Sequence, residues 1–139
     1  GLGIVKDLLR FSRHPEGLYV AGEMLIQTGE FDDAVALLTA AQEMAKRMLR
    51  GEIAFGSLDP GLATYRTDTM LGQALLKLGR VEDAKKRLQD AKAAQLIPQA
   101  ATLELLARCA DAEGNPREAK RLREEATDPA VAKDFAYSS

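Results

Sequence analysis

The sequence of 139 residues contains no tryptophan, one cysteine, Cys109, and one histidine, His14. A single cysteine excludes an internal disulfide and a zinc cluster built from several cysteines. A single histidine argues against a conventional zinc enzyme and against a Ser-His-Asp triad. The Gly-Lys-Ser/Thr element of a phosphate-binding loop is also absent. We therefore expect no catalytic residues, no metal and no cofactor, and predict that the protein is not an enzyme.

The low aromatic content and the slightly negative net charge limit the kinds of partner that the protein can bind. Aromatic residues make up only 5% of the chain, and the formal net charge is −2, so neither base stacking nor phosphate neutralisation is favoured. We expect no nucleic-acid partner. No stretch approaches the ~20 apolar residues that cross a bilayer, so no direct membrane span is expected in this chain.

The cellular location follows less directly from the sequence. The chain starts with Gly1 rather than Met. This start is consistent with a domain cut from a longer protein, and tethering to a membrane by a missing segment stays open. The compartment is unknown, with the cytoplasm favoured over the periplasm.

The chain does contain a six-residue phrase that occurs three times, at Gly29–Ala34, Gly79–Ala84 and Gly114–Ala119. In each copy the Gly is followed two residues later by an apolar or ring residue, and five residues later by an Ala. A Gly can end a helix in a left-handed cap, and a small Ala lets the next helix pack closely. A helix–turn–helix unit repeated along a chain predicts a solenoid.

Helical spacing of apolar residues runs through all segments between the Gly and Pro positions, and nothing is typical of a strand. Asp59–Pro60 and Asn115–Pro116 each combine a capping residue with Pro at the first helical position. The expected helices are a first one through residues 4–11, then 15–28, 32–50, 60–78, 81–95, 98–113 and 116–126, and a short last one through Val131 and Phe135.

These units resemble tetratricopeptide repeats over residues 15 to 127. The first unit carries the pattern at Leu18, Ala21, Gly22, Leu25, Gly29, Phe31, Ala34, Leu38 and Ala41. The second carries it at Leu71, Gly72, Leu75, Gly79, Val81, Ala84, Leu88 and Ala91, and the third at Leu103, Leu106, Ala107, Ala110, Gly114, Pro116, Ala119 and Ala126. Asp68 stands where the pattern has a large apolar residue. The resemblance implies an all-α, right-handed α-α superhelix of antiparallel helix pairs.

One spacing departs from the family period. Gly79 and Gly114 are 35 residues apart, close to the ~34 of the family, whereas Gly29 and Gly79 are 50 apart. We expect two helices to be lengthened by about two turns each, giving a projecting helical hairpin. The predicted single domain then consists of an N-terminal capping helix (1–14), repeat 1 (15–48), the insertion (49–64), repeat 2 (65–98), repeat 3 (99–127) and a C-terminal cap or tail (128–139).

The resemblance implies a non-catalytic interaction module or scaffold in a larger assembly, with a protein or peptide partner in a concave groove lined by the first helix of each pair. By position, the groove residues would be Tyr19, Glu23, Gln27, Arg66, Thr69, Met70, Gln73, Lys77, Glu104, Arg108 and Asp111. The alternative is that Glu104, Arg108 and Asp111 form a solvated ladder of ion pairs. The basic and amide cluster with which some relatives grip a chaperone tail is not reproduced here.

Other residues have two interpretations each. Ile53, Phe55 and Leu58 form a second interface at the insertion tip, or fold back onto the first helix. The terminal helices cap the solenoid, or make the protein a homo-oligomer. A regulatory sensor of a small ligand or signal peptide is a further alternative function. Cys109 is expected to be buried, His14 to mark a helix boundary, and the cluster Lys85, Lys86, Arg87 and Lys92 to be a solvated face.

Overall fold

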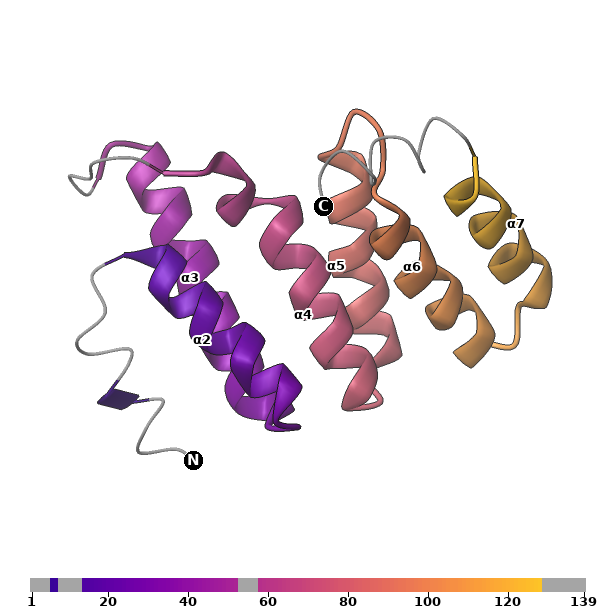
Figure 1. Ribbon diagram of the computed structural model, residues 1–139, viewed down its shortest axis with the longest axis horizontal. Helices are drawn as coiled ribbons and strands as arrows, with labels where there is room; N and C mark the ends of the chain where they lie inside the picture. Colours follow the sequence, from indigo (N-terminus) through magenta and orange to yellow (C-terminus); the bar gives the residue numbers. More distant parts are fainter. Residues whose placement is uncertain (1–5, 8–13, 53–57, 129–139) are drawn as a thin grey trace.

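The computed structural model describes residues 6–7, 14–52 and 58–128 of the chain. Within these residues the structure is helical, without strands, which confirms the predicted all-α class. The helices stand side by side in chain order and pack as the pairs α2–α3, α4–α5 and α6–α7 (Figure 1). Their bounds are α2 (Pro15–Gln27), α3 (Phe31–Leu49), the 3-10 helix η1 (Pro60–Ala63), α4 (Tyr65–Lys77), α5 (Val81–Ala93), α6 (Ala100–Ala112) and α7 (Pro116–Ala126).

The turn inside each pair has the predicted left-handed glycine. The φ angles of Gly29, Gly79 and Gly114 are 82°, 79° and 75°. In the first turn the amide of Glu30 donates to the Leu25 carbonyl at 2.8 Å, and the amide of Gly29 donates to Ile26 at 3.1 Å. The same two bonds recur in the other two turns, so each helix end is closed by a Schellman motif.

Small residues let the paired helices approach closely. Ala34, Ala84 and Ala119, the last residues of the repeated phrase, are all buried. A Cβ atom added to Gly72 of α4 would lie 2.4 Å from Cγ of Leu88 in α5. The pairing of α4 with α5 therefore depends on the absence of a side chain at residue 72.

The extra residues between the first and second pairs lengthen only one of the two helices that were expected to be longer. Helix α3 has 19 residues, six more than α5, whereas α4 has the same 13 residues as α5 and α6. The predicted helix 60–78 is interrupted at Thr64, whose φ and ψ are −133° and −113°. The segment η1 packs instead on the extended end of α3, since burial of Leu62 and Ala63 is worth more than continuation of a helix into water.

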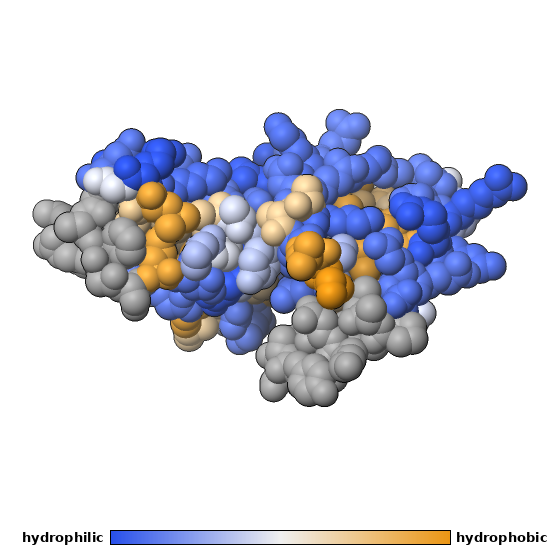
Figure 2. All heavy atoms as spheres, turned by 90° about the horizontal axis from the view of Figure 1, so that it is seen from above, coloured by the Kyte–Doolittle hydropathy of each residue, from blue (hydrophilic) through white to orange (hydrophobic). Residues whose placement is uncertain are grey.

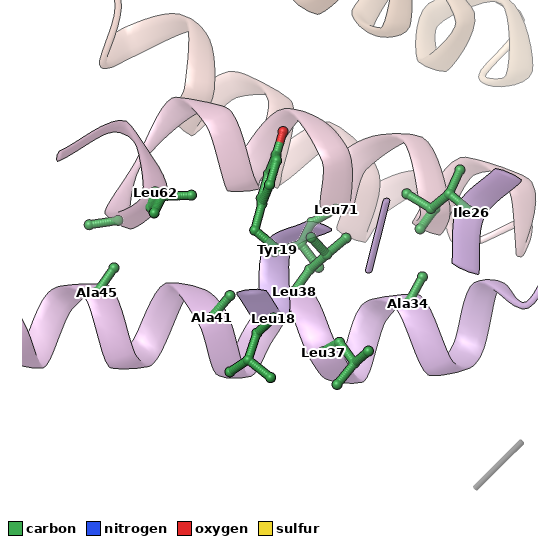
Figure 3. Packing of buried hydrophobic residues seen from close by; sticks show 12 residues of the cluster. Leu18, Tyr19, Ile26, Ala34, Leu37, Leu38, Ala41, Ala45, Leu62 and Leu71 are labelled. Atoms are coloured by element: carbon green, nitrogen blue, oxygen red, sulfur yellow. The ribbon is translucent and has the colours of Figure 1, made fainter. Parts of the chain in front are cut away.

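The core follows the helix pairs from one repeat to the next. Its first part holds Leu18, Leu37, Leu38 and Leu71 from α2, α3 and α4 (Figure 3). Tyr19 was predicted to lie open in the groove. The structure corrects this prediction, because only 8% of the surface of Tyr19 is exposed. Figure 3 shows its ring within the cluster and its hydroxyl at the side away from α3.

The first helices of the pairs lie on the inner side of the curved array. Helix α4 contacts both α2 and α6, whereas no comparable contact joins α3 to α5 or α5 to α7 in the part of the chain described. The helices α2, α4 and α6 are therefore called the inner helices, and α3, α5 and α7 the outer helices. The expected helix 4–11, the tip residues Ile53 and Phe55, and the terminal helix through Val131 and Phe135 lie outside the described residues, apart from the helical residues 6–7.

Candidate functional site

The residues predicted for the groove lie on the three inner helices. Tyr19, Glu23 and Gln27 belong to α2, the set Arg66, Thr69, Met70, Gln73 and Lys77 belongs to α4, and Glu104, Arg108 and Asp111 belong to α6. Gln27, Lys77, Arg108 and Asp111 are exposed, and the others except Tyr19 are half-buried. The structure divides this set into four groups with different surroundings.

The first group is centred on Arg66, which joins α2, η1 and α4. Its guanidinium lies 3.1 Å from Glu16 and 2.7 Å from Asp59, and its carbon is 4.5 Å from the centre of the Tyr19 ring. Burial alone would lower the pKa of Arg66, but the hydrogen bonds to Glu16 and Asp59 raise it above its ordinary value. Burial raises the pKa of Tyr19, and the neighbouring Arg66 partly opposes that effect. The charge of Arg66 is thus already compensated inside the protein.

The second group connects α4 to its neighbours. The hydroxyl oxygens of Thr69 and Thr102 are 3.1 Å apart and share a hydrogen bond between α4 and α6. Met70 packs against the first part of the core. Both residues are therefore mainly part of the helix packing.

The third group forms a small cleft between α4 and α6. Gln73, Lys77 and Arg108 lie around it, its remaining walls are Leu76 and Leu105, and its volume is about 200 Å³. Among the described residues Lys77 has no ion pair, and the only carboxylate near Arg108 is Glu104, at 3.7 Å. The cleft thus combines apolar walls with an amide and two cations that are open to solvent.

The fourth group faces the outer helix α7. Arg123 of α7 lies 3.2 Å from Glu104 and 2.7 Å from Asp111. With the pair between Glu104 and Arg108 these contacts form a continuous ion-pair network, which agrees with the ladder alternative for Glu104 and Asp111 and extends it by Arg123. Arg123 occupies the position in its repeat that Leu38 and Leu88 occupy in the other two.

Sequence reasoning missed the partners of the predicted residues. Glu16, Leu76 and Leu105 all line the inner surface, yet none was predicted. Each lies three or four residues from a predicted position on the same helix, at Tyr19, Gln73 and Arg108. Counting one full turn in both directions would have found them, because residues three and four apart share a helix face.

A buried polar network crosses the boundary between the first two repeats. Asp68 of α4 is 6% exposed and Gln42 of α3 is 4% exposed. Gln42 donates through Nε2 to Asp68 Oδ1 at 2.9 Å, and Arg87 of α5 donates to Gln42 Oε1 at 2.8 Å and to Asp68 Oδ1 at 3.4 Å. Burial raises the pKa of Asp68, while Gln42 and Arg87 act in the opposite direction. Arg87 was expected to lie on a solvated face. Its guanidinium instead reaches this network, where its positive charge compensates the buried carboxylate of Asp68.

Three minor expectations can also be compared with the structure. Cys109 is buried as predicted, and burial raises the pKa of its thiol to about 11. His14 is the N-cap of α2, and its Nδ1 accepts a hydrogen bond from the Glu16 amide at 3.1 Å. Leu58 is partly buried against the core, and both interpretations of the insertion tip stay predictions, because the first helix lies outside the described residues.

The comparison with family models now adds an independent observation. The model of the tetratricopeptide repeat matches residues 15–38 and 65–90, which cover α2 with the start of α3, and α4 with most of α5. This match supports the assignment of the chain to the tetratricopeptide-repeat family. The third helix pair, α6–α7, repeats the same turn and the same buried alanine. A search of the curated proteins found no significant match.

The similarity to tetratricopeptide repeats indicates the function only in general terms. Tetratricopeptide repeats generally mediate protein–protein interaction or scaffolding, typically without catalysis, which suggests a protein partner. In the part of the chain that the structure describes, no helix is both long and apolar enough to cross a membrane. Within the same residues, no group of three or more His, Cys, Asp or Glu side chains is placed to hold a metal ion.

Proposed function

We propose that the protein is an interaction module that holds a segment of a partner protein on its inner helices, at the cleft between α4 and α6. The observation that supports this most is the combination of exposed positive charge with apolar walls: Lys77 has no ion pair among the described residues, and Arg108 has only a 3.7 Å contact with Glu104. Lys77 and Arg108 lie beside Leu76 and Leu105, whereas Arg66, at the other end of the inner surface, is held by Glu16 and Asp59.

The charges indicate which partner segment fits. An anionic group of the partner would meet Lys77 and Arg108, Gln73 can donate or accept a hydrogen bond, and a short apolar side chain would cover Leu76 and Leu105. We therefore propose an acidic segment that carries at least one apolar residue. A cleft of about 200 Å³ suits one side chain, so neighbouring surface would contribute the remaining contacts.

The test is affinity capture from an extract of the source organism, with the bound proteins quantified for three versions of the chain. The cleft variant carries Lys77→Glu and Arg108→Glu. The control variant carries Lys86→Glu and Lys120→Glu, which make the same change of charge at exposed residues of the outer helices. Circular dichroism establishes that all three versions are folded.

The proposal predicts a protein that the wild type and the control retain and the cleft variant loses. Binding of a synthetic acidic segment of that protein should then weaken at least tenfold with the cleft variant. The proposal is contradicted if the cleft variant retains as much of the partner protein as the wild type does. It is also contradicted if the control variant loses the partner to the same extent as the cleft variant, since that would indicate a general effect of charge.

Self-association is a second candidate function, supported by a different observation. Val20 and Met24 lie one turn apart on α2 and are 46% and 59% exposed. Neighbouring exposed apolar side chains of this kind would become buried in a contact between two copies of the chain. Sedimentation velocity over a concentration series tests this candidate: a dimer that Met24→Glu abolishes supports it, and a monomer at all concentrations contradicts it.

A further inference from the structure

The outer helices leave two grooves, each with an inner helix as its floor. The first lies between α3 and α5 over Leu71 and Leu75, and the second between α5 and α7 over Leu106 and Ala110. A shift of 35 residues converts the α4 and α5 positions of the first groove into the α6 and α7 positions of the second. The two grooves therefore occupy equivalent positions in successive repeats. Residues that differ between them indicate which ligand each groove could bind.

The second groove has an apolar side chain at the position where the first groove has the inward-reaching Arg87. Arg87, which in the first groove reaches inward to Gln42, is replaced by Leu122, and Leu75 is replaced by Ala110. Leu96 and Pro98 from the turn between α5 and α6 add apolar surface, and Leu96 is completely exposed. The second groove encloses about 480 Å³, a volume in the range of small-molecule sites.

One hydrogen-bond donor in the wall of this groove has no acceptor. Nε2 of Gln95 is buried and has no partner among the described residues. The other amide atom, Oε1, accepts a hydrogen bond from the backbone N–H of Gln99 at 3.0 Å, which fixes the orientation of the amide because a flip would oppose two donors. A buried donor without an acceptor lowers the stability of the folded protein. A ligand that supplies an acceptor would recover that free energy on binding.

Ion pairs limit the length of the groove. Lys85 lies 3.1 Å from Glu113, the C-cap of α6, and Lys92 lies 3.4 Å from Glu125 of α7, so each lysine joins α5 to another element of the groove. Seven residues separate Lys85 and Lys92, which corresponds to about 10 Å along a helix. This closure favours a compact ligand over a long peptide segment.

We propose that the groove between α5 and α7 binds a small organic ligand with an apolar body and a carbonyl or carboxylate oxygen. The apolar body contacts Leu106, Leu122 and Leu96, and the oxygen accepts a hydrogen bond from Gln95 Nε2. This site lies between two outer helices and shares no lining residue with the cleft between α4 and α6, so either proposal can hold without the other.

The experiment is a titration of the full chain followed by ¹H–¹⁵N NMR. The probe is naphthalene-1-acetate, and the matched compound is 1-naphthylmethylamine, which has the same rings but donates instead of accepting. We expect the acetate to shift the Gln95 side-chain amide and the backbone amides near Leu96 and Leu122, and to bind at least tenfold more tightly than the amine.

Three variants identify the contacts. Gln95→Glu keeps an acceptor for the Gln99 amide but removes the donor, and should weaken acetate binding at least tenfold. Ala110→Leu restores the leucine of the first groove and should abolish binding by filling the site. Thr39→Ala changes the wall of the first groove and should leave binding unchanged.

The proposal is overturned if millimolar acetate leaves the Gln95 and Leu122 signals unshifted, or if the amine binds as tightly as the acetate. It is also overturned if Gln95→Glu binds as tightly as the wild type. That comparison decides the matter even if Ala110→Leu fails to fold.

Discussion

Gln42 and Asp68 are joined by a 2.9 Å hydrogen bond between two helices of different repeats, both side chains being almost completely buried. The other two repeats have Leu18 and Leu103 at the position of Asp68. The second repeat therefore exchanges an apolar contact for a polar one that also engages Arg87. A polar group that finds its partner in only one arrangement favours one register of packing between the first two repeats.

Replacing one member of this network should cost more than replacing two. We expect Asp68→Leu to lower the free energy of unfolding by about 1–3 kcal/mol, because Gln42 keeps a buried amide without an acceptor. The double variant Asp68→Leu with Gln42→Leu should recover most of the loss, since Arg87 can turn toward solvent. Urea unfolding of the four versions measures the coupling, and additive effects would show that the network does not act as a unit.

The raised pKa of Asp68 predicts a pH dependence of definite sign. A carboxyl whose pKa is higher in the folded than in the unfolded protein binds more protons when folded, so its contribution to stability falls as the pH rises through the interval between the two values. The stability of the wild type relative to Asp68→Asn should therefore increase on acidification toward the ordinary carboxyl pKa, and be constant at neutral pH. Thermal unfolding of both proteins over that range tests the sign, and an opposite slope contradicts the assignment.

Two glycines should respond to the same substitution in opposite ways. Gly72→Ala places a Cβ atom 2.4 Å from Leu88 Cγ and should destabilise the protein by about 1–3 kcal/mol through overpacking. Gly17→Ala in α2 has no neighbouring atom within 4 Å and should stabilise it by up to about 1 kcal/mol through helix propensity. Equilibrium unfolding of both variants measures the contrast, and equal effects would contradict the close approach of α4 and α5.

Arg123 should keep the surface that α6 and α7 form together from associating with other molecules. Arg123→Leu restores the residue type of Leu38 and Leu88 but removes the ion pairs to Glu104 and Asp111. Because these pairs are partly exposed, monomer stability should fall by less than about 1 kcal/mol. The new apolar surface should cause association that increases with concentration in light scattering. The control Arg123→Gln should stay at the size of the wild type, and association of both variants would contradict the argument.

Cys109 should be almost unreactive in the folded protein. Its thiol is 1% exposed, and burial raises its pKa to about 11, so little thiolate exists at pH 8 and little reagent reaches it. We expect reaction with an aromatic disulfide reagent to be at least a hundredfold slower in buffer than in denaturing urea. Comparable rates in the two conditions would show that α6 opens readily.

The sequence predicted the parts of this structure that depend on local chemistry. The turns at Gly29, Gly79 and Gly114 formed where expected, because a left-handed residue after a helix strongly favours glycine. The start of α7 was also found, since Pro116 follows the capping residue Asn115. These features need information from only a few adjacent residues.

The parts that failed depend on contacts between distant residues. The break at Thr64 reflects the burial of Leu62 on the extended end of α3, which no local pattern indicates. Tyr19 was placed at the surface by its position in the repeat, but the neighbouring repeat and Arg66 cover it. The same holds for Arg87, whose partners Gln42 and Asp68 are 45 and 19 residues away in sequence.

The order in which the helices contact one another also bears on how the protein folds. Each helix packs mainly on its neighbours along the chain, and α7 rests chiefly on α6. Folding therefore needs no joining of the two ends, and such chains of mostly local contacts fold quickly. Loss of structure can also begin at α7 while α2 and α3 remain packed, so amide protons of the last pair should exchange with solvent sooner than those around Leu37 and Leu38.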